Sequence, residues 1–165
     1  MADPAPLEID LKAIIEEKER KSKVFSSIGA FTFQFSQLEF TIRSLLGRML
    51  KLTELQFDAV TAPYDFAILC TVTKIILTQN FQPRENEIKI IFNKCRELND
   101  NRVRIAHGLW SDDGRKISTR HVPRQNLVAN QFFEDSNELA QLTETAQRLM
   151  VGVLNLARGD KPREV

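Results

Sequence analysis

Residues 28–52, IGAFTFQFSQLEFTIRSLLGRMLKL, decide the fold of this chain. Their apolar residues recur at alternating spacings of three and four, which is the period of one face of an α-helix. The members of this row are Ile28, Phe31, Phe35, Leu38, Ile42, Leu45, Met49 and Leu52. The row predicts a helix of about seven turns that buries one face in a helical bundle.

Further side chains widen the apolar face of this helix. Phe25, Phe33 and Phe40 fall outside the regular row, so we expect the helix to be covered on more than one side, by bundle neighbours or by a second subunit. A polar stripe runs beside the row and consists of Thr32, Ser36, Glu39 and Arg43.

The rest of the chain predicts further helices and one β excursion. An amphipathic helix covers 7–23, a short helix starts at its cap Thr53, and another starts at its cap Asp65. A further helix runs from Glu85 to the region of His107, and the last starts at Ser136 or Asp135. A hairpin over 109–119 surrounds the turn sequence Asp-Asp-Gly, while 123–131 reads as irregular. We therefore predict an all-α fold, a four-to-five-helix up-and-down bundle with a small β-hairpin after the helix that ends near His107.

Composition is typical of a single globular domain. The 165 residues are 42% hydrophobic and 27% charged, with a net charge of +1, so no overall field attracts nucleic acid or membrane. We expect one domain over 1–165, with its core at about 7–157 and a flexible tail at 158–165. Cys70 and Cys95 lie in apolar helical patterns and are predicted to be reduced core thiols. The first residues are acidic with no apolar run behind them, so we expect a cytoplasmic protein without a signal peptide or membrane contact.

The segment 99–110, NDNRVRIAHGLW, holds the candidate chemistry. An arginine holds a phosphate through two hydrogen bonds, and imidazole side chains titrate near neutral pH. Five residues place Arg102 and His107 roughly 140° apart around a continuous helix. They share a cleft only if the helix ends near His107, as Gly108 allows, or if a second copy faces the first. The inner face of the helix extends to Arg102, which predicts partial burial with Asp100, Glu39 or a bound phosphate as acceptor.

Each member of the pair also has an ordinary structural interpretation. A helical arginine is usually solvated or paired with a carboxylate, and a histidine before glycine is usually stabilised by the negative end of the helix dipole. His121 is a second acid–base candidate, although a surface histidine is the more common interpretation.

Positive charge is concentrated around this segment. Two acidic residues, Asp112 and Asp113, lie among the cationic residues of 102–124, which are Arg102, Arg104, Arg115, Lys116, Arg120 and Arg124. Such a local patch suits an RNA backbone, and a solvated hairpin would show the same composition.

The Arg-x4-His segment, followed by Gly108 and Trp110 at the end of a bundle helix, resembles the Arg-x(4–6)-His motif of HEPN (higher eukaryotes and prokaryotes nucleotide-binding) domains. The resemblance covers about residues 22–157 as a pattern. It implies a bundle that dimerises so that two motifs line one cleft, with Arg102 and His107 catalytic and with neither metal nor other cofactor. Family members often carry asparagine directly after the motif arginine. Here that residue is Val103, and Asn99 and Asn101 are the substitutes on the next turn.

Two functions follow as hypotheses. The first is a homodimeric, metal-independent endoribonuclease, of the kind found in toxin–antitoxin, abortive-infection and other antiviral systems, with RNA as substrate and an antitoxin or other protein as a further partner. Arg102 and His107 carry the chemistry, Asn99, Asn101 and Glu39 support them, and Arg104, Arg115, Lys116, Arg120 and Arg124 bind RNA. The alternative is a non-catalytic helical module that binds RNA, a nucleotide or a protein partner.

Overall fold

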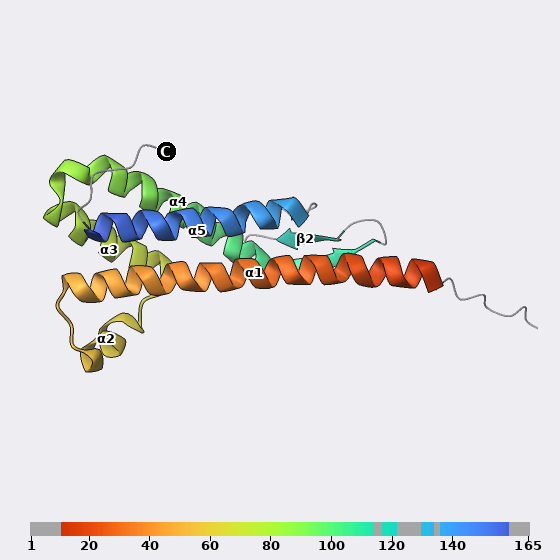
Figure 1. The fold of residues 1–165 in the computed structure, drawn as a ribbon, viewed down its shortest axis with the longest axis horizontal. Coiled ribbons are helices and arrows are strands. Elements are labelled where there is room, and N and C mark those ends of the chain that lie inside the picture. The colour runs from red at the N-terminus through yellow and green to blue at the C-terminus, as the bar shows by residue number, and fades with distance from the viewer. Residues whose placement is uncertain (1–10, 114–116, 122–129, 134–135, 159–165) are drawn as a thin grey trace, which may run out of the picture.

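The computed structural model describes residues 11–113, 117–121, 130–133 and 136–158. Over these residues the chain forms five α-helices, one short 3₁₀ helix (Gln82–Arg84) and a three-stranded antiparallel sheet (Figure 1). The helices are α1 (Leu11–Met49), α2 (Glu54–Thr61), α3 (Phe66–Asn80), α4 (Glu85–His107) and α5 (Ser136–Arg158). The strands are β1 (Leu109–Asp112), β2 (Ile117–His121) and β3 (Asn130–Phe132). The prediction of a mostly helical fold with a small hairpin after the helix that ends at His107 is confirmed.

One continuous helix, α1, replaces the two helices predicted for the first third of the chain. No glycine or proline interrupts residues 24–27, so the helical hydrogen bonding of 11–23 continues into the core segment. The predicted row is buried along α1, at Phe31, Phe35, Leu38, Ile42 and Leu45. In Figure 1, α1 is the long helix that runs beside α5, and its start extends beyond α5.

Side-chain caps place the starts of α2 and α3 where the sequence predicts them. Thr53 and Gln56 form a reciprocal capping box at α2. Asp65 accepts a hydrogen bond of 2.8 Å from the backbone N–H of Ile68 at α3. α2 stands apart from the other helices at the end of α1 (Figure 1).

The sheet follows α4 directly and is larger than predicted. β1 and β2 form the expected hairpin, with Ser111 opposite Ser118. β3 adds a third strand, with Phe132 opposite Thr119, so the end of the segment expected to be irregular is extended and paired. Only three residues of β3 are paired, too few for a period-two pattern to stand out.

Gly108 ends α4 as predicted, for a steric reason. Its φ of −72° is in the extended region, so no left-handed turn requires a glycine here. A Cβ atom at this position would lie 2.0 Å from Thr119 Oγ1 and 2.4 Å from the Arg104 carbonyl oxygen. A side chain therefore has no room between the end of α4 and β2.

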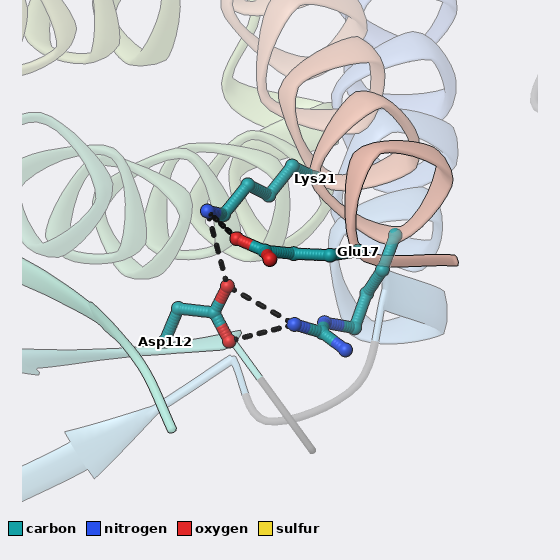
Figure 2. Close-up of polar contacts among 4 residues, drawn as sticks. Glu17, Lys21 and Asp112 are labelled. Carbon is teal, nitrogen blue, oxygen red and sulfur yellow. Dashed lines mark hydrogen bonds and ion pairs between the residues drawn. The ribbon is translucent and has the colours of Figure 1, made fainter. Parts of the chain in front are cut away.

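A polar cluster ties the first half of α1 to the end of β1 (Figure 2). The Asp112 carboxylate accepts hydrogen bonds of 2.9 and 3.1 Å from Arg20 Nη2 and lies 3.6 Å from Lys21 Nζ. Lys21 also pairs with Glu17 on the preceding turn. These contacts hold the sheet against α1, whereas residues 11–19 extend further and are exposed.

Two further sequence predictions concern membrane-spanning helices and the tail at 158–165. Among the described residues no single helix is both long and apolar enough to cross a membrane, and α2 with α3 reach that length only as a pair bent by 118°. The predicted tail at 158–165 lies outside the described residues apart from Arg158 at the end of α5.

Candidate functional site

Arg102 lies on α4 where that helix faces α1. Its guanidinium carbon is 6.0 Å from the centre of the buried Phe35 ring, a cation–π distance. The residue is exposed and makes no hydrogen bond or ion pair with the described residues. The prediction that Arg102 is partly buried is therefore wrong, and neither Asp100 nor Glu39 is its acceptor; its orientation toward α1 is confirmed.

Glu39 does not pair with Arg102 because another arginine already binds it. Arg43, one turn further along α1, donates hydrogen bonds of 2.6 and 3.2 Å to Glu39 Oε1. Arg43 also donates to the backbone carbonyls of Thr61 and Tyr64, the latter at 2.8 Å. This network anchors the start of α3 to α1 and leaves the Arg102 guanidinium available to an anion.

Two clefts flank Arg102, and Phe35, Glu39 and Arg102 line both of them. The first, which we call the α3 cleft, has a volume of about 330 Å³. Its other lining residues are Arg43, Tyr64, Asp65, Phe66, Ala67, Asn99 and Val103. The second, the α1 cleft, has a volume of about 350 Å³ and lies between α1 and the last turns of α4. Its other lining residues are Ile28, Phe31, Thr32, Ser36, Ile105 and Ala106.

Two of the three predicted supporting residues line these clefts. Asn99 lines the α3 cleft beside Arg102, and Glu39 lines both clefts, so both are placed at the site. Asn101 faces elsewhere and accepts a hydrogen bond of 2.9 Å from Arg104. The sequence did not indicate that the start of α3, with Tyr64 and Phe66, forms a wall of the site. The cap at Asp65 locates that helix start but not its neighbours.

His107 is the last residue of α4 and is exposed. It lines neither cleft and has no hydrogen bond or ion pair with the described residues. Because α4 is helical from Arg102 through His107, the two side chains point in different directions, as their spacing predicts. One chain therefore does not bring the pair together.

Two of the predicted RNA-binding cations lie in the described residues. The Arg104 guanidinium carbon is 4.4 Å from the centre of the Phe132 ring, so Arg104 fastens β3 to α4. Arg120 is exposed on β2. Arg115, Lys116 and Arg124 lie outside the described residues, as does the side chain of His121.

The two cysteines and the tryptophan belong to the core. Cys70 and Cys95 are buried and unpaired, as predicted. The pKa of the Cys70 thiol is raised, mainly by its hydrogen bond with Cys95 and secondly by burial. The thiol is therefore protonated at neutral pH and is not a nucleophile. Trp110 donates a hydrogen bond of 3.0 Å to the Ile105 carbonyl and packs on Phe133.

Within the part of the chain that the structure describes, no group of three or more histidine, cysteine, aspartate or glutamate residues is placed to hold a metal ion.

No protein-family model matches the chain, and no curated protein or solved structure matches it either. The functional argument therefore depends on the site itself.

Proposed function

We propose that this chain is a metal-independent endoribonuclease that acts in the cytoplasm as a homodimer, with Arg102 and His107 as its catalytic residues. One observation carries the proposal. The Arg102 guanidinium is exposed, makes no hydrogen bond or ion pair with the described residues, and lies between two clefts. An unpaired guanidinium between the α3 cleft and the α1 cleft suits a phosphodiester, because it can bind the phosphate while the two flanking nucleosides enter the clefts.

The chemistry follows from the two residue types. The RNA 2′-oxygen attacks the adjacent phosphorus and loses its proton to an imidazole. The bond from phosphorus to the 5′-oxygen breaks, and that oxygen takes a proton from an imidazolium. The products are a 2′,3′-cyclic phosphate and a 5′-hydroxyl. Acid–base catalysis of this kind contributes about 10²–10⁴-fold, and the guanidinium stabilises the charge that develops on the phosphate oxygens.

A second copy supplies what a single chain lacks. His107 lines neither cleft beside its own Arg102, so the proposal needs an imidazole from a partner. Phe25, Phe33 and Phe40, which the sequence predicts to be covered, are exposed on α1 and are available for such an interface. The Arg-x4-His resemblance to HEPN domains supports the same arrangement and adds an antitoxin or other restraining protein as a candidate partner.

Cleavage of single-stranded RNA in the presence of EDTA tests the proposal. We expect cleavage by the wild-type protein and a loss of roughly 10²–10³-fold in Arg102→Ala, as for other residues that stabilise transition-state charge. His107→Gln should lose a similar factor. Arg96→Ala is the matched control, because Arg96 is an exposed arginine on the same helix that lines neither cleft and contacts Thr71. A substrate with a single 2′-deoxynucleotide should resist cleavage at that position alone.

Three outcomes would refute the nuclease. They are cleavage that survives both substitutions, cleavage that EDTA abolishes, and cleavage of the 2′-deoxy position. Equal losses in Arg102→Ala and Arg96→Ala would show that the effect does not come from the clefts.

A non-catalytic binding module is the second candidate, and one observation favours it. Val103 lines the α3 cleft at the place where a polar side chain would assist Arg102. This candidate predicts saturable binding of a nucleotide or short RNA without cleavage. Binding should weaken in Arg102→Ala and should not change in His107→Gln, whereas the nuclease requires both residues.

A further inference from the structure

The α3 cleft contains polar groups that the fold itself does not use. Asn99 is half-buried in its wall, and the Asn99 amide makes no hydrogen bond with the described residues. Asp65 uses only one carboxylate oxygen within the described chain, because Oδ1 caps α3 by accepting a hydrogen bond of 2.8 Å from the backbone N–H of Ile68. A carboxylate has about four lone pairs. Asp65 therefore keeps most of its capacity to accept hydrogen bonds from a ligand.

Apolar side chains line the same cleft. Phe35 and Phe66 are buried, with their ring centres 4.5 Å apart, and Val103 is half-buried on α4. The cleft volume of about 330 Å³ falls at the lower end of the range for small-molecule sites, which is about 300–1,000 Å³. A nucleobase is planar and packs well against such side chains. The cleft therefore combines an apolar surface with the amide of Asn99 and the second carboxylate oxygen of Asp65, as sites that recognise single-stranded bases do.

Hydrogen bonds on both sides of Asp65 fix it in place before any ligand binds. The backbone carbonyl of Tyr64, the preceding residue, accepts a hydrogen bond of 2.8 Å from Arg43, and the cap bond with Ile68 holds the carboxylate itself. Glu39, the other carboxylate in the cleft, already accepts two hydrogen bonds from Arg43 at Oε1. A group that its own surroundings hold in place loses little conformational freedom on binding. Asp65 is therefore the carboxylate better suited to recognise a ligand.

A carboxylate discriminates among the four RNA bases by their hydrogen-bond donors and acceptors. Guanine presents two adjacent N–H donors, at N1 and N2, which match the two oxygens of one carboxylate. Adenine and cytosine place a ring-nitrogen acceptor beside their amino group, and uracil places its single N–H between two carbonyl oxygens. In each of these three bases an acceptor would face the negative carboxylate, which can only accept. A carboxylate in the cleft therefore favours guanine.

We propose that the α3 cleft binds the base of a guanosine nucleotide, with Asp65 accepting hydrogen bonds from N1 and N2, Asn99 donating to O6, and Arg102 binding the phosphate. Arg102 suits this role because it lines the cleft, is exposed, and makes no hydrogen bond or ion pair with the described part of the chain. Asn99 and Arg102 lie one turn apart on α4, and Asp65 faces the cleft from the start of α3. The step from binding to cleavage rests on the proposed function, under which the chain cuts RNA next to guanosines.

Calorimetric titration of the full chain with the four nucleoside 3′,5′-bisphosphates tests the guanine site without reference to activity. These probes carry a phosphate on each side of the ribose, so the test does not depend on the direction in which RNA crosses Arg102. We expect guanosine 3′,5′-bisphosphate to bind about 10–100-fold more tightly than each of the other three, as for other paired contacts to a base edge. Equal affinities, a preference for another base, or no binding of any probe would overturn the proposal.

Asp65→Asn removes the carboxylate and keeps the helix cap, because asparagine and aspartate cap helices equally well. We expect a Tm close to that of the wild type and an affinity for guanosine 3′,5′-bisphosphate that falls about 10–100-fold. Asp65→Ser, which also caps the helix, should lose the same preference. Asp100→Asn is the matched control, because Asp100 is exposed, lies two residues from Arg102 and lines neither cleft. Equal losses in Asp65→Asn and Asp100→Asn, or a preference for guanosine that survives Asp65→Asn, would overturn the proposal.

Sequencing the ends produced from random-sequence RNA extends the test to cleavage. Every cut by the wild-type chain should lie next to a guanosine, always on the same side, and the cuts by Asp65→Asn should spread to other bases. Selective binding of guanosine 3′,5′-bisphosphate by a chain that cuts no RNA would leave the guanine site standing and refute the nuclease. Cleavage without base preference, together with equal affinities for the four probes, would refute the guanine site and leave the nuclease standing.

Discussion

Gly108 joins α4 to β1, and we predict that Gly108→Ala destabilises the protein strongly. The added methyl carbon would lie 2.0 Å from Thr119 Oγ1 and 2.4 Å from the Arg104 carbonyl oxygen. Thr119 is fully buried, and the second contact is with backbone, so neither atom moves without shifting β2 or the last turn of α4. Overpacking of this kind costs about 1–3 kcal/mol, and the backbone contact places this variant at the upper end. About 3 kcal/mol corresponds to a fall in Tm of roughly 6–12 °C for a chain of this size.

A double-mutant cycle with Thr119→Ala isolates the clash. Thr119 Oγ1 is buried and has no hydrogen-bond partner among the described residues, so no bond is lost when it is removed. Thr119→Ala should cost only about 1 kcal/mol for the buried volume. In Gly108→Ala, Thr119→Ala the hydroxyl contact is absent, so the free energies of unfolding should be non-additive by about 1 kcal/mol or more. Chemical denaturation followed by circular dichroism measures all four proteins. Additive effects, or a Gly108→Ala protein as stable as the wild type, would refute this account of the junction.

Three further predictions concern other parts of the fold. Asp112→Asn should weaken the contact between β1 and Arg20 by up to about 1 kcal/mol, because both side chains are partly exposed, and the difference from the wild type in thermal unfolding should shrink at high salt. Thr53→Ala removes the capping box of α2 and should cost about 1 kcal/mol, seen as faster amide exchange in α2 and not in α4. Cys70 and Cys95 should not react with a thiol reagent at pH 8 in the folded protein, because both are buried and the pKa of Cys70 is raised by its hydrogen bond with Cys95 and by burial. Both should react in denaturant, and rapid labelling of the folded chain would contradict this prediction.

Local signals account for the parts of the fold that the sequence predicts well. Thr53 and Asp65 cap their helices through their own side chains, and both helix starts are confirmed. The buried row of α1 is confirmed for the same reason, because a period of 3.6 is a property of the helix itself. The sequence does not predict that 11–23 and 28–52 belong to one helix, because the side-chain pattern changes between them while the backbone remains helical.

The site was predicted less completely because it depends on competition between side chains. The period of α4 correctly turns Arg102 toward α1, but it does not show that Arg43 already binds Glu39. Burial of Arg102 was expected because the inner face of its helix continues past Leu98 to this residue. In the structure, however, a cleft opens on either side of Arg102. The i,i+4 spacing of Glu39 and Arg43 was the available signal for that competing pair.

Mixing two inactive variants tests the central claim, a site shared between two chains, most directly. Arg102→Ala and His107→Gln chains are denatured together in equal amounts, refolded and assayed on RNA in EDTA. If each site takes Arg102 from one chain and His107 from the other, half of the dimers are mixed and each mixed dimer holds one intact site. The mixture should then recover about a quarter of wild-type activity. A mixture as inactive as its two components would contradict the shared site.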